Sequence, residues 1–177
     1  VAFCPFSDLL EYLKRTMGNA ASSEASYGDA PRKHVAIIGG GSSGIILMKE
    51  LQEAGHTFEC FEMLPTIGGV YVKSYESTVL TTSSLLTAWS DYSDGKESTP
   101  KFWSADEYLE YINNFCDNFD LRRHISFSTQ VTEVKKCKKS GQWLVTIQKG
   151  VASNGGRAEN VPDQTKKFKP MTRKFDC

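Results

Sequence analysis

The chain has 177 residues, of which 40% are hydrophobic and 24% are charged, a composition typical of a globular domain. Its 21 basic and 21 acidic residues give a formal net charge of zero, so composition provides no general electrostatic reason to bind nucleic acid or an anionic membrane. No apolar stretch approaches the roughly 20 residues that a membrane-spanning helix needs, so we predict no transmembrane segment in these residues. The length corresponds by default to one domain with a real core.

The first part of the chain differs in composition from the rest. Residues 18–31 are small, polar and turn-rich, so we expect residues 1–32 to be a disordered or non-native tail. Within it, the segment from Met17 to Ser22 fits the N-myristoylation signal M-G-x-x-x-S. The acyl chain attaches only to an N-terminal glycine, so Gly18 becomes an acceptor only if Met17 is the true start. A chance match in an Ala/Ser-rich segment is the alternative, and a single acyl chain would give only marginal membrane attachment.

A glycine-rich turn between two predicted elements is the most informative motif. Residues 34–38 (HVAII) form a short, β-branched apolar run that reads as a buried strand. Residues 39–44 (GGGSSG) follow at once and match G-x-G-x-x-G, and residues 45–54 then show helical spacing. A second strand is predicted over residues 57–61, and it ends at Glu62. This strand–turn–helix–strand order predicts a dinucleotide-binding unit of Rossmann type.

Each position of this motif has a physical role. Gly39 allows the tight turn out of the strand, Gly41 lets a pyrophosphate approach the backbone, and Gly44 lets the helix pack against the strands. The helix N-terminus offers free N–H groups and a positive dipole to phosphates. An acid at position 62 suits a ribose diol and disfavours a 2′-phosphate, so FAD or NAD fits this site better than NADP. The predicted dinucleotide-binding residues are Gly39, Gly40, Gly41, Ser42, Ser43, Gly44 and Glu62.

Several short segments after Glu62 occur in the order found in one family. They are Gly68-Gly69-Val70-Tyr71, Thr81-Thr82-Ser83-Ser84, Trp89-Ser90-Asp91-Tyr92, Asp106-Glu107-Tyr108-Leu109, Phe119-Asp120-Leu121, the alternating run over 125–131, and Gly141-Gln142-Trp143-Leu144-Val145. Together with the glycine-rich turn they resemble the N-terminal FAD-binding part of the flavin-containing monooxygenases. The resemblance covers about residues 33–149, with a weaker match at 172–177.

The resemblance implies a fold and a cofactor. Residues 33–177 are expected to form an α/β, Rossmann-like FAD-binding domain with a parallel sheet plus a β-hairpin or meander. The domain would be incomplete at its C-terminus, where residues 175–177 resemble the start of a strand of the central sheet. The sequence holds no second G-x-G-x-x-G, so the NADP-binding domain is expected to be absent. The FAD contacts implied beyond the first glycine turn are Gly69, Val70, Tyr71 and, near the adenine, Val131.

The resemblance also implies a reaction. In a complete protein, NADPH would reduce FAD, and the reduced flavin with O2 would form a C4a-hydroperoxide that oxygenates a soft nitrogen or sulfur nucleophile. Thr82 stands where many members have an Asn beside the flavin, so it is the candidate catalytic residue. Tyr71 likewise replaces the usual Trp. We expect the 177-residue chain alone to show no monooxygenase turnover.

Two alternatives stay open at this stage. The first is another two-dinucleotide flavoprotein, such as a Baeyer–Villiger enzyme acting on ketones or a reductase, although no redox cysteine pair supports a disulfide reductase. The second is a non-catalytic, truncated FAD-binding protein with a binding or regulatory role.

The remaining residues predict structure rather than chemistry. Ser104 and Glu107 form an S-x-x-E capping box for a helix to about Asn118, whose aromatic face we interpret as core packing. A strand is predicted over 125–131, and the alternating Trp143, Val145 and Ile147 predict a hairpin strand. The lysine runs at 135–139 and 166–169 read as solvated turns.

The cysteines and histidines show no metal-ligand pattern. There is no C-x-x-C and no zinc-ligand spacing, so we expect no metal and ordinary structural or surface thiols. Scattered free cysteines favour a reducing, cytoplasmic location, with membrane association depending on Gly18. The cysteines are Cys4, Cys60, Cys116, Cys137 and Cys177.

Overall fold

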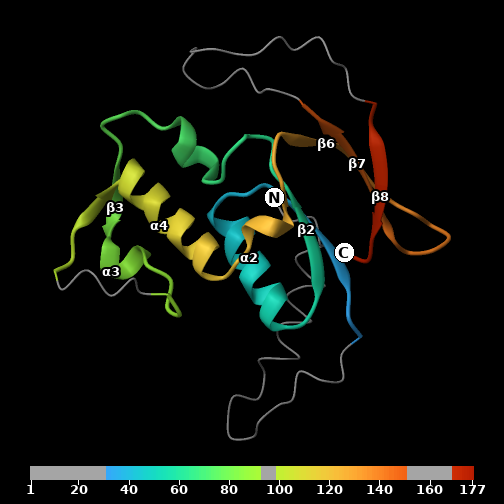
Figure 1. Cartoon of the computed structure of the whole chain (residues 1–177), viewed down its shortest axis with the longest axis horizontal. Coiled ribbons are helices and arrows are strands. Elements are labelled where there is room, and N and C mark those ends of the chain that lie inside the picture. Colours follow the sequence, from blue (N-terminus) through green and yellow to red (C-terminus); the bar gives the residue numbers. More distant parts are fainter. Residues whose placement is uncertain (1–30, 93–98, 151–168) are drawn as a thin grey trace, which may run out of the picture.

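The computed structural model describes residues 31–92, 99–150 and 169–177 (Figure 1). The predicted tail, except for its last two residues, and the acylation signal at Gly18 lie outside these residues. Most of the lysine run at 166–169 lies outside them as well.

The central layer is a three-stranded parallel sheet with the order β1-β2-β5. β1 (His34–Ile38) pairs with β2 (Thr57–Phe61), and β2 pairs with the short β5 (Ile125–Ser126). The helix α2 (Ser42–Glu53) connects β1 to β2, because parallel neighbours require a crossover. Both predicted strands and the α/β class with a parallel sheet are therefore confirmed.

The helix α2 begins at Ser42, so the start predicted at Ile45 is three residues too late. Gly39 has φ +98°, which turns the chain out of β1 at one residue. Gly41 is already the extended N-cap, with φ −82° and ψ −177°. The turn is thus complete within three glycines, and both serines of the motif fall in the first helical turn. The predicted stop is confirmed, since Gly55 follows the helix with φ +73°.

The single strand predicted over residues 125–131 is wrong. Ser128 has φ +49°, which interrupts the extended backbone between β5 and β6 (Thr129–Lys136). Two hydrogen bonds hold this kink: Ser128 N–H donates to the Leu64 carbonyl at 3.1 Å, and Gly150 N–H donates to the Ser128 carbonyl at 2.8 Å. The chain therefore leaves the parallel sheet at this point and enters a second sheet.

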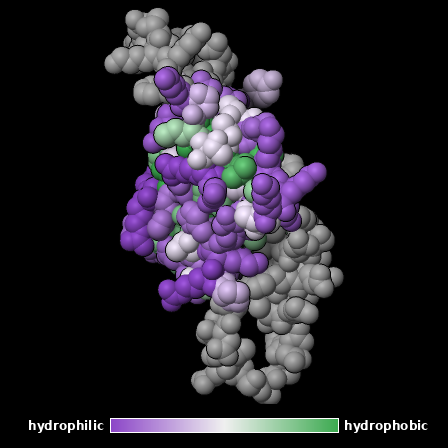
Figure 2. Space-filling view, turned by 90° about the vertical axis from the view of Figure 1, so that its right-hand side faces the viewer, coloured by the Kyte–Doolittle hydropathy of each residue, from purple (hydrophilic) through white to green (hydrophobic). Residues whose placement is uncertain are grey.

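The second sheet is an antiparallel meander with the order β6-β7-β8. β7 (Trp143–Lys149) pairs with β6 on one side and with β8 (Met171–Phe175) on the other. Its inner face packs on the central sheet through the buried cluster Phe61, Val145, Ile147 and Phe175. The side of the molecule that carries β8 is mainly hydrophilic (Figure 2). The predicted hairpin and meander are confirmed.

The last two residues return from the meander to the parallel sheet. Asp176 N–H donates to the His34 carbonyl at 2.8 Å, and Ala36 N–H donates to the Cys177 carbonyl at 2.9 Å. The Asp176 carboxylate also accepts from His34 N–H at 2.9 Å. Phe175 itself ends β8, so the predicted return of residues 175–177 to the central sheet begins at Asp176.

A second helix and a small sheet complete the described fold. α4 (Ala105–Asn118) begins with the predicted capping box, in which Glu107 N–H donates to Ser104 Oγ and Ser104 N–H donates to the Glu107 carboxylate. Its aromatic face is buried in the main core with α2 and the parallel sheet, as predicted. The small antiparallel pair and the short helices are β3 (Val79–Ser83), β4 (Phe102–Ser104), α3 (Ser84–Thr87), η2 (Gly69–Lys73) and η3 (Arg122–His124).

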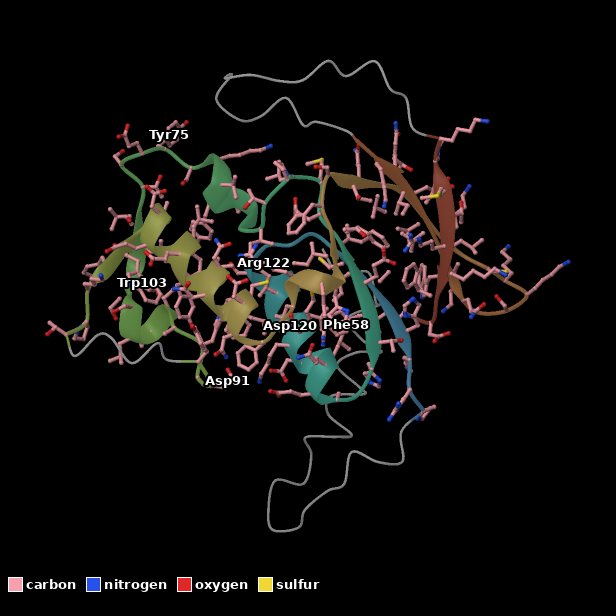
Figure 3. All side chains as sticks on the ribbon, in the orientation of Figure 1. Phe58, Tyr75, Asp91, Trp103, Asp120 and Arg122 are labelled. Carbon is pink, nitrogen blue, oxygen red and sulfur yellow. The ribbon has the colours of Figure 1, made fainter. Side chains whose placement is uncertain are left out.

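A buried lysine ties α2 to the segment that follows α3. Lys49 is 6% exposed, and its ammonium pairs with Glu50 at 3.2 Å, with Glu53 at 2.9 Å and with Asp91. Asp91 is labelled in Figure 3. The ammonium also lies 5.8 Å from the centroid of the Phe119 ring. Burial alone would lower the pKa of Lys49, but the hydrogen bonds to the three carboxylates outweigh it and raise that pKa. The charge is therefore retained inside the fold.

We predict that Lys49→Met lowers the free energy of unfolding by about 1–2 kcal/mol, because it removes the cation from a partly buried set of carboxylates. The expected loss is below the range for a fully buried pair, since the Asp91 side chain is 44% exposed. The matched control is Lys135→Met, which breaks an exposed pair with Glu133 and should cost less than about 0.5 kcal/mol. Urea titrations followed by circular dichroism measure both. Equal losses would contradict the prediction.

The same ion pair predicts a pH dependence. The hydrogen bond from Lys49 lowers the pKa of Asp91 from 3.8, so the pair contributes stability above pH 3.8 and loses it as the pH falls through the lower folded value. The raised pKa of Lys49 keeps the ammonium charged throughout the neutral range. The difference in unfolding free energy between the wild type and Lys49→Met should therefore be constant at neutral pH and shrink below about pH 4.

Candidate functional site

The N-terminus of α2 faces the end of β1 with no side chain capping it. No side-chain hydrogen bond caps the helix, and its first turn carries no acidic residue. The first N–H groups of a helix have no partner within the helix, and the helix dipole places partial positive charge there. Such an end attracts an anion, and no protein carboxylate of the first turn competes for it.

Contacts at the glycines show why the motif needs them. A Cβ on Gly44 would lie 2.1 Å from the Gly39 carbonyl oxygen, so only glycine lets α2 pass this close to the end of β1. Gly69 has φ +59°, and a Cβ there would lie 3.2 Å from Gly41 Cα. The second glycine pair is held against the first by a hydrogen bond from Gly68 N–H to the Gly40 carbonyl at 2.9 Å. The two glycine turns thus pack backbone against backbone.

Glu62 is fixed at the carboxyl end of β2. The residue is 5% exposed, and its carboxylate accepts from Gly40 N–H at 2.5 Å and from Leu64 N–H at 2.7 Å. A Cβ on Gly40 would lie 3.3 Å from Glu62 Oε2, tighter than most real Cβ contacts. Two backbone donors therefore orient the carboxylate beside the glycine-rich turn, and its remaining lone pairs can accept from hydroxyl groups of a ligand.

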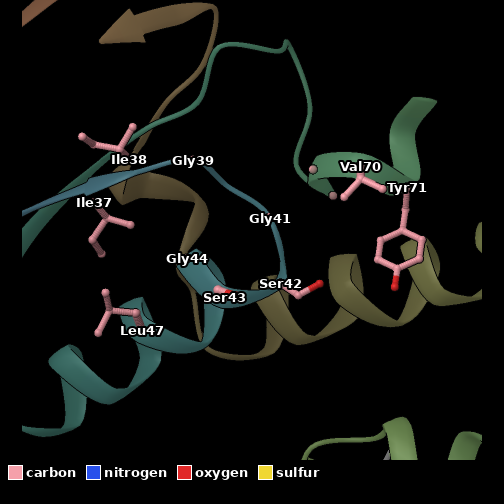
Figure 4. A pocket seen from close by; sticks show the side chains of 12 residues that line it. Ile37, Ile38, Gly39, Gly41, Ser42, Ser43, Gly44, Leu47, Val70 and Tyr71 are labelled. Carbon is pink, nitrogen blue, oxygen red and sulfur yellow. The ribbon is translucent and has the colours of Figure 1, made fainter. Parts of the chain in front are cut away.

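A cavity of about 330 Å³ lies between the two glycine turns (Figure 4). Eight of the residues predicted for the cofactor line it, whereas Gly40 and Glu62 do not line it and are hydrogen-bonded to each other. The glycine motif did not predict that Ile37, Ile38 and Leu47 line the cavity. Their positions in the apolar strand and helix next to the motif could have indicated it. The full lining is Ile37, Ile38, Gly39, Gly41, Ser42, Ser43, Gly44, Leu47, Gly68, Gly69, Val70 and Tyr71.

Four predicted site residues are not among those that line this cavity: Gly40, Glu62, Val131 and Thr82. Val131 lies in β6, partly buried against the Phe61 cluster, and Thr129 N–H donates to the Glu62 carbonyl at 2.8 Å, which brings the start of β6 beside β2. Thr82 lies in β3 with an exposed side chain, and its hydroxyl is 2.7 Å from that of Thr87. The roles of Val131 and Thr82 stay predictions.

Among the described residues, neither a cluster of metal ligands nor a reactive thiol at the two buried cysteines is found. No group of three or more His, Cys, Asp or Glu side chains within residues 31–92, 99–150 and 169–177 could hold a metal ion. Burial raises the pKa of Cys60 to about 12 and that of Cys116 to about 11, which keeps these thiols protonated and inert. Within the same residues, every helix is too short or too polar to cross a bilayer.

We predict that alanine destabilises the fold strongly at one glycine of the turn and little at another. Gly44→Ala should lower the free energy of unfolding by about 3 kcal/mol or more, because the new methyl group meets a backbone oxygen that cannot move aside. Gly41→Ala is the matched control, since its Cβ meets only Gly69 Cα at 3.5 Å and its φ suits any residue. Urea unfolding should show Gly41→Ala within about 1 kcal/mol of the wild type. Similar stabilities for the two variants would refute the packing described here.

The sequence of the chain is similar to a known family and to curated proteins. A family model described as "FMO-like: Flavin-binding monooxygenase-like" matches residues 32–161. Flavin-containing monooxygenase 2 of Homo sapiens is 37% identical over 144 residues, which cover 74% of this chain and 26% of that protein. A "4-hydroxybenzoate brominase (decarboxylating)" of Pseudoalteromonas luteoviolacea is 39% identical over 118 residues, which cover 66% of this chain and 22% of that protein.

Solved structures of similar proteins share the fold. The S-allyl-L-cysteine S-oxygenase of Allium sativum superposes with a TM-score of 0.66 at 22% identity, covering 82% of this chain and 35% of that one. An open crystal structure of cyclohexanone monooxygenase gives a TM-score of 0.60 at 32% identity, covering 67% of this chain and 24% of that one. The chain spans between a fifth and about a quarter of the length of the curated relatives that it matches.

Proposed function

The chain belongs to the flavin-binding monooxygenase-like family, and from this premise we propose that its residues hold the adenosine diphosphate half of FAD. The observation that carries the proposal is the uncapped N-terminus of α2, which opens onto a cavity between two glycine turns beside a carboxylate fixed at the end of β2. Residues 33–177 would then be the FAD-binding domain, with residues 1–32 outside it.

The residues present fit this ligand. The first N–H groups of α2 suit the pyrophosphate, and the missing Cβ atoms at Gly41 and Gly69 leave backbone-lined space for it. Glu62 suits the ribose hydroxyl groups, because its carboxylate is already oriented by the backbone N–H groups of Gly40 and Leu64. We place the adenine near Val131, since β6 is tied to Glu62 at its start.

The chemistry supplied by a bound flavin is acceptance of a hydride and activation of dioxygen. The described residues contribute binding and orientation: they fix the nucleotide end, and the surrounding apolar side chains exclude water from it. We propose that Thr82, which stands where many members of the family have an Asn beside the flavin, would contribute a hydroxyl that can donate or accept a hydrogen bond. The hydrogen bond with Thr87 would orient that hydroxyl.

For the complete protein we propose NADPH as the reductant and O2 with a soft nitrogen or sulfur nucleophile as the substrates. One relative is described as an N-oxide-forming dimethylaniline monooxygenase, and the structural neighbour from Allium sativum is an S-oxygenase. A Baeyer–Villiger reaction on a ketone is the second candidate, which the similarity to cyclohexanone monooxygenase favours. A cytoplasmic location, with membrane attachment through Gly18 only if Met17 is the start, completes the proposal.

The test is a binding comparison with the 177-residue chain. FAD and ADP share the adenosine diphosphate group and should both bind, whereas FMN lacks the adenosine half and should bind at least tenfold more weakly. Gly41→Ala should lose ADP binding while keeping its thermal unfolding midpoint. Calorimetric titration and flavin fluorescence measure these affinities. Folded protein that binds neither ADP nor FAD would overturn the proposal, and equal affinity for FMN and FAD would do the same.

We also predict that Glu62→Gln weakens ADP-ribose binding about tenfold, since charge-assisted hydrogen bonds to the ribose are lost. The same change should also reduce the ratio of the affinity for ADP-ribose to the affinity for 2′-phospho-ADP-ribose, because the carboxylate that repels the 2′-phosphate is gone. Glu59→Gln is the control: Glu59 lies within β2, its carboxylate contacts Ser126 and Arg173, and the change should leave both affinities unchanged. An unaltered preference in Glu62→Gln would contradict the ribose assignment.

A further inference from the structure

The helix α4 places a tyrosine hydroxyl against the phosphate-binding turn. Tyr108 is 5% exposed, and its hydroxyl donates to Ser42 Oγ at 3.2 Å. Ser42 is the first residue of α2 and lines the cavity, where Figure 4 shows its side chain beside the turn. A serine hydroxyl that accepts one hydrogen bond still carries its own hydrogen. Ser42 can therefore donate to a second acceptor while Tyr108 holds its oxygen in place.

Aromatic neighbours fix the position of the Tyr108 ring. Its centroid lies 4.7 Å from that of Tyr71, edge to face, and 6.0 Å from that of Trp103 in a stacked arrangement. Tyr71 belongs to η2 and lines the same cavity, so Tyr108 contacts residues of both turns. Burial raises the pKa of the Tyr108 phenol, so that the hydroxyl stays protonated and remains a donor at neutral pH.

We propose that Tyr108 is a positioning residue for the anionic part of the ligand: it orients the Ser42 hydroxyl to donate to a phosphate oxygen. The inference rests on the proposed nucleotide site and deepens it. The periodicity of α4 assigns Tyr108 to core packing, and the ring does pack there, but packing does not account for a hydroxyl aimed at a cavity-lining serine. The ring and the hydroxyl of Tyr108 thus have separate roles, and a substitution that removes only the hydroxyl tests the second role.

The experiment compares ADP with adenosine as probes of the 177-residue chain, by ligand-detected NMR titration, which reads weak binding. Tyr108→Phe keeps the ring and removes the hydroxyl, so it should lower the affinity for ADP about threefold to tenfold and leave that for adenosine unchanged within twofold. Ser42→Ala should do the same. The double variant should lose no more than either single variant, because the two side chains act as one unit.

Tyr111→Phe is the matched control. Tyr111 lies one turn further along α4 and is buried in the same cluster, but its hydroxyl donates to the Tyr92 carbonyl and accepts from Trp89 N–H. It should leave the affinity for ADP unchanged. The ³¹P chemical shifts of bound ADP should move in Tyr108→Phe and stay in place in Tyr111→Phe, which a purely structural role of Tyr108 would not produce.

Other outcomes would overturn the inference. Equal losses for ADP and adenosine, an unchanged ADP affinity, or additive losses in the double variant would each reject the positioning role while leaving the nucleotide site intact. Folded wild-type chain that binds neither ADP nor FAD would reject the site itself. If Tyr108→Phe does not fold, Ser42→Ala decides: an unchanged ADP affinity in that variant rejects the inference.

Discussion

The approach of Gly44 to the Gly39 carbonyl is the contact on which the described site depends. Because no Cβ separates them, α2 begins directly at the end of β1, and its first N–H groups face the space beyond the sheet. The same short turn places Gly40 N–H where it donates to the Glu62 carboxylate. The turn therefore positions both the start of α2 and this carboxylate. A side chain at position 44 would separate the anion-attracting and hydroxyl-accepting halves of the site.

The second glycine pair extends this constraint to the rest of the chain. Gly68 donates to the Gly40 carbonyl, and Gly69 lies against Gly41, so the segment after β2 is packed on the first turn rather than on a layer of side chains. Tyr71 lies two residues after Gly69 and contacts Tyr108 of α4. The cavity wall is therefore built from two segments that are separate in sequence, within 37–47 and 68–71, and Tyr108 of α4 packs against Tyr71 of that wall.

Local sequence signals predicted those parts of the fold that local forces determine. The β-branched run before Gly39, the glycine spacing and the capping box at Ser104 each act within a few residues, and each was confirmed. The strand expected over residues 125–131 failed because Ser128 is held at positive φ by bonds to Leu64 and Gly150, which lie far from it in sequence. The helix start was placed too late because glycine geometry, not hydrophobic periodicity, determines where α2 begins. The role inferred for Tyr108 could likewise not be predicted from a local sequence pattern, since its partner Ser42 lies 66 residues away in the sequence.

The hydrogen bonds between β1 and the last residues have a consequence for folding order. His34 and Asp176 are 142 positions apart, yet each bonds to the other's backbone or side chain. One edge of the first strand can be completed only after the meander has formed and docked, because β8 leads directly into those residues. Contacts of such long sequence separation carry a high loop-closure cost and form late. During synthesis the glycine turn would thus emerge early beside a sheet edge that stays open until the meander has followed.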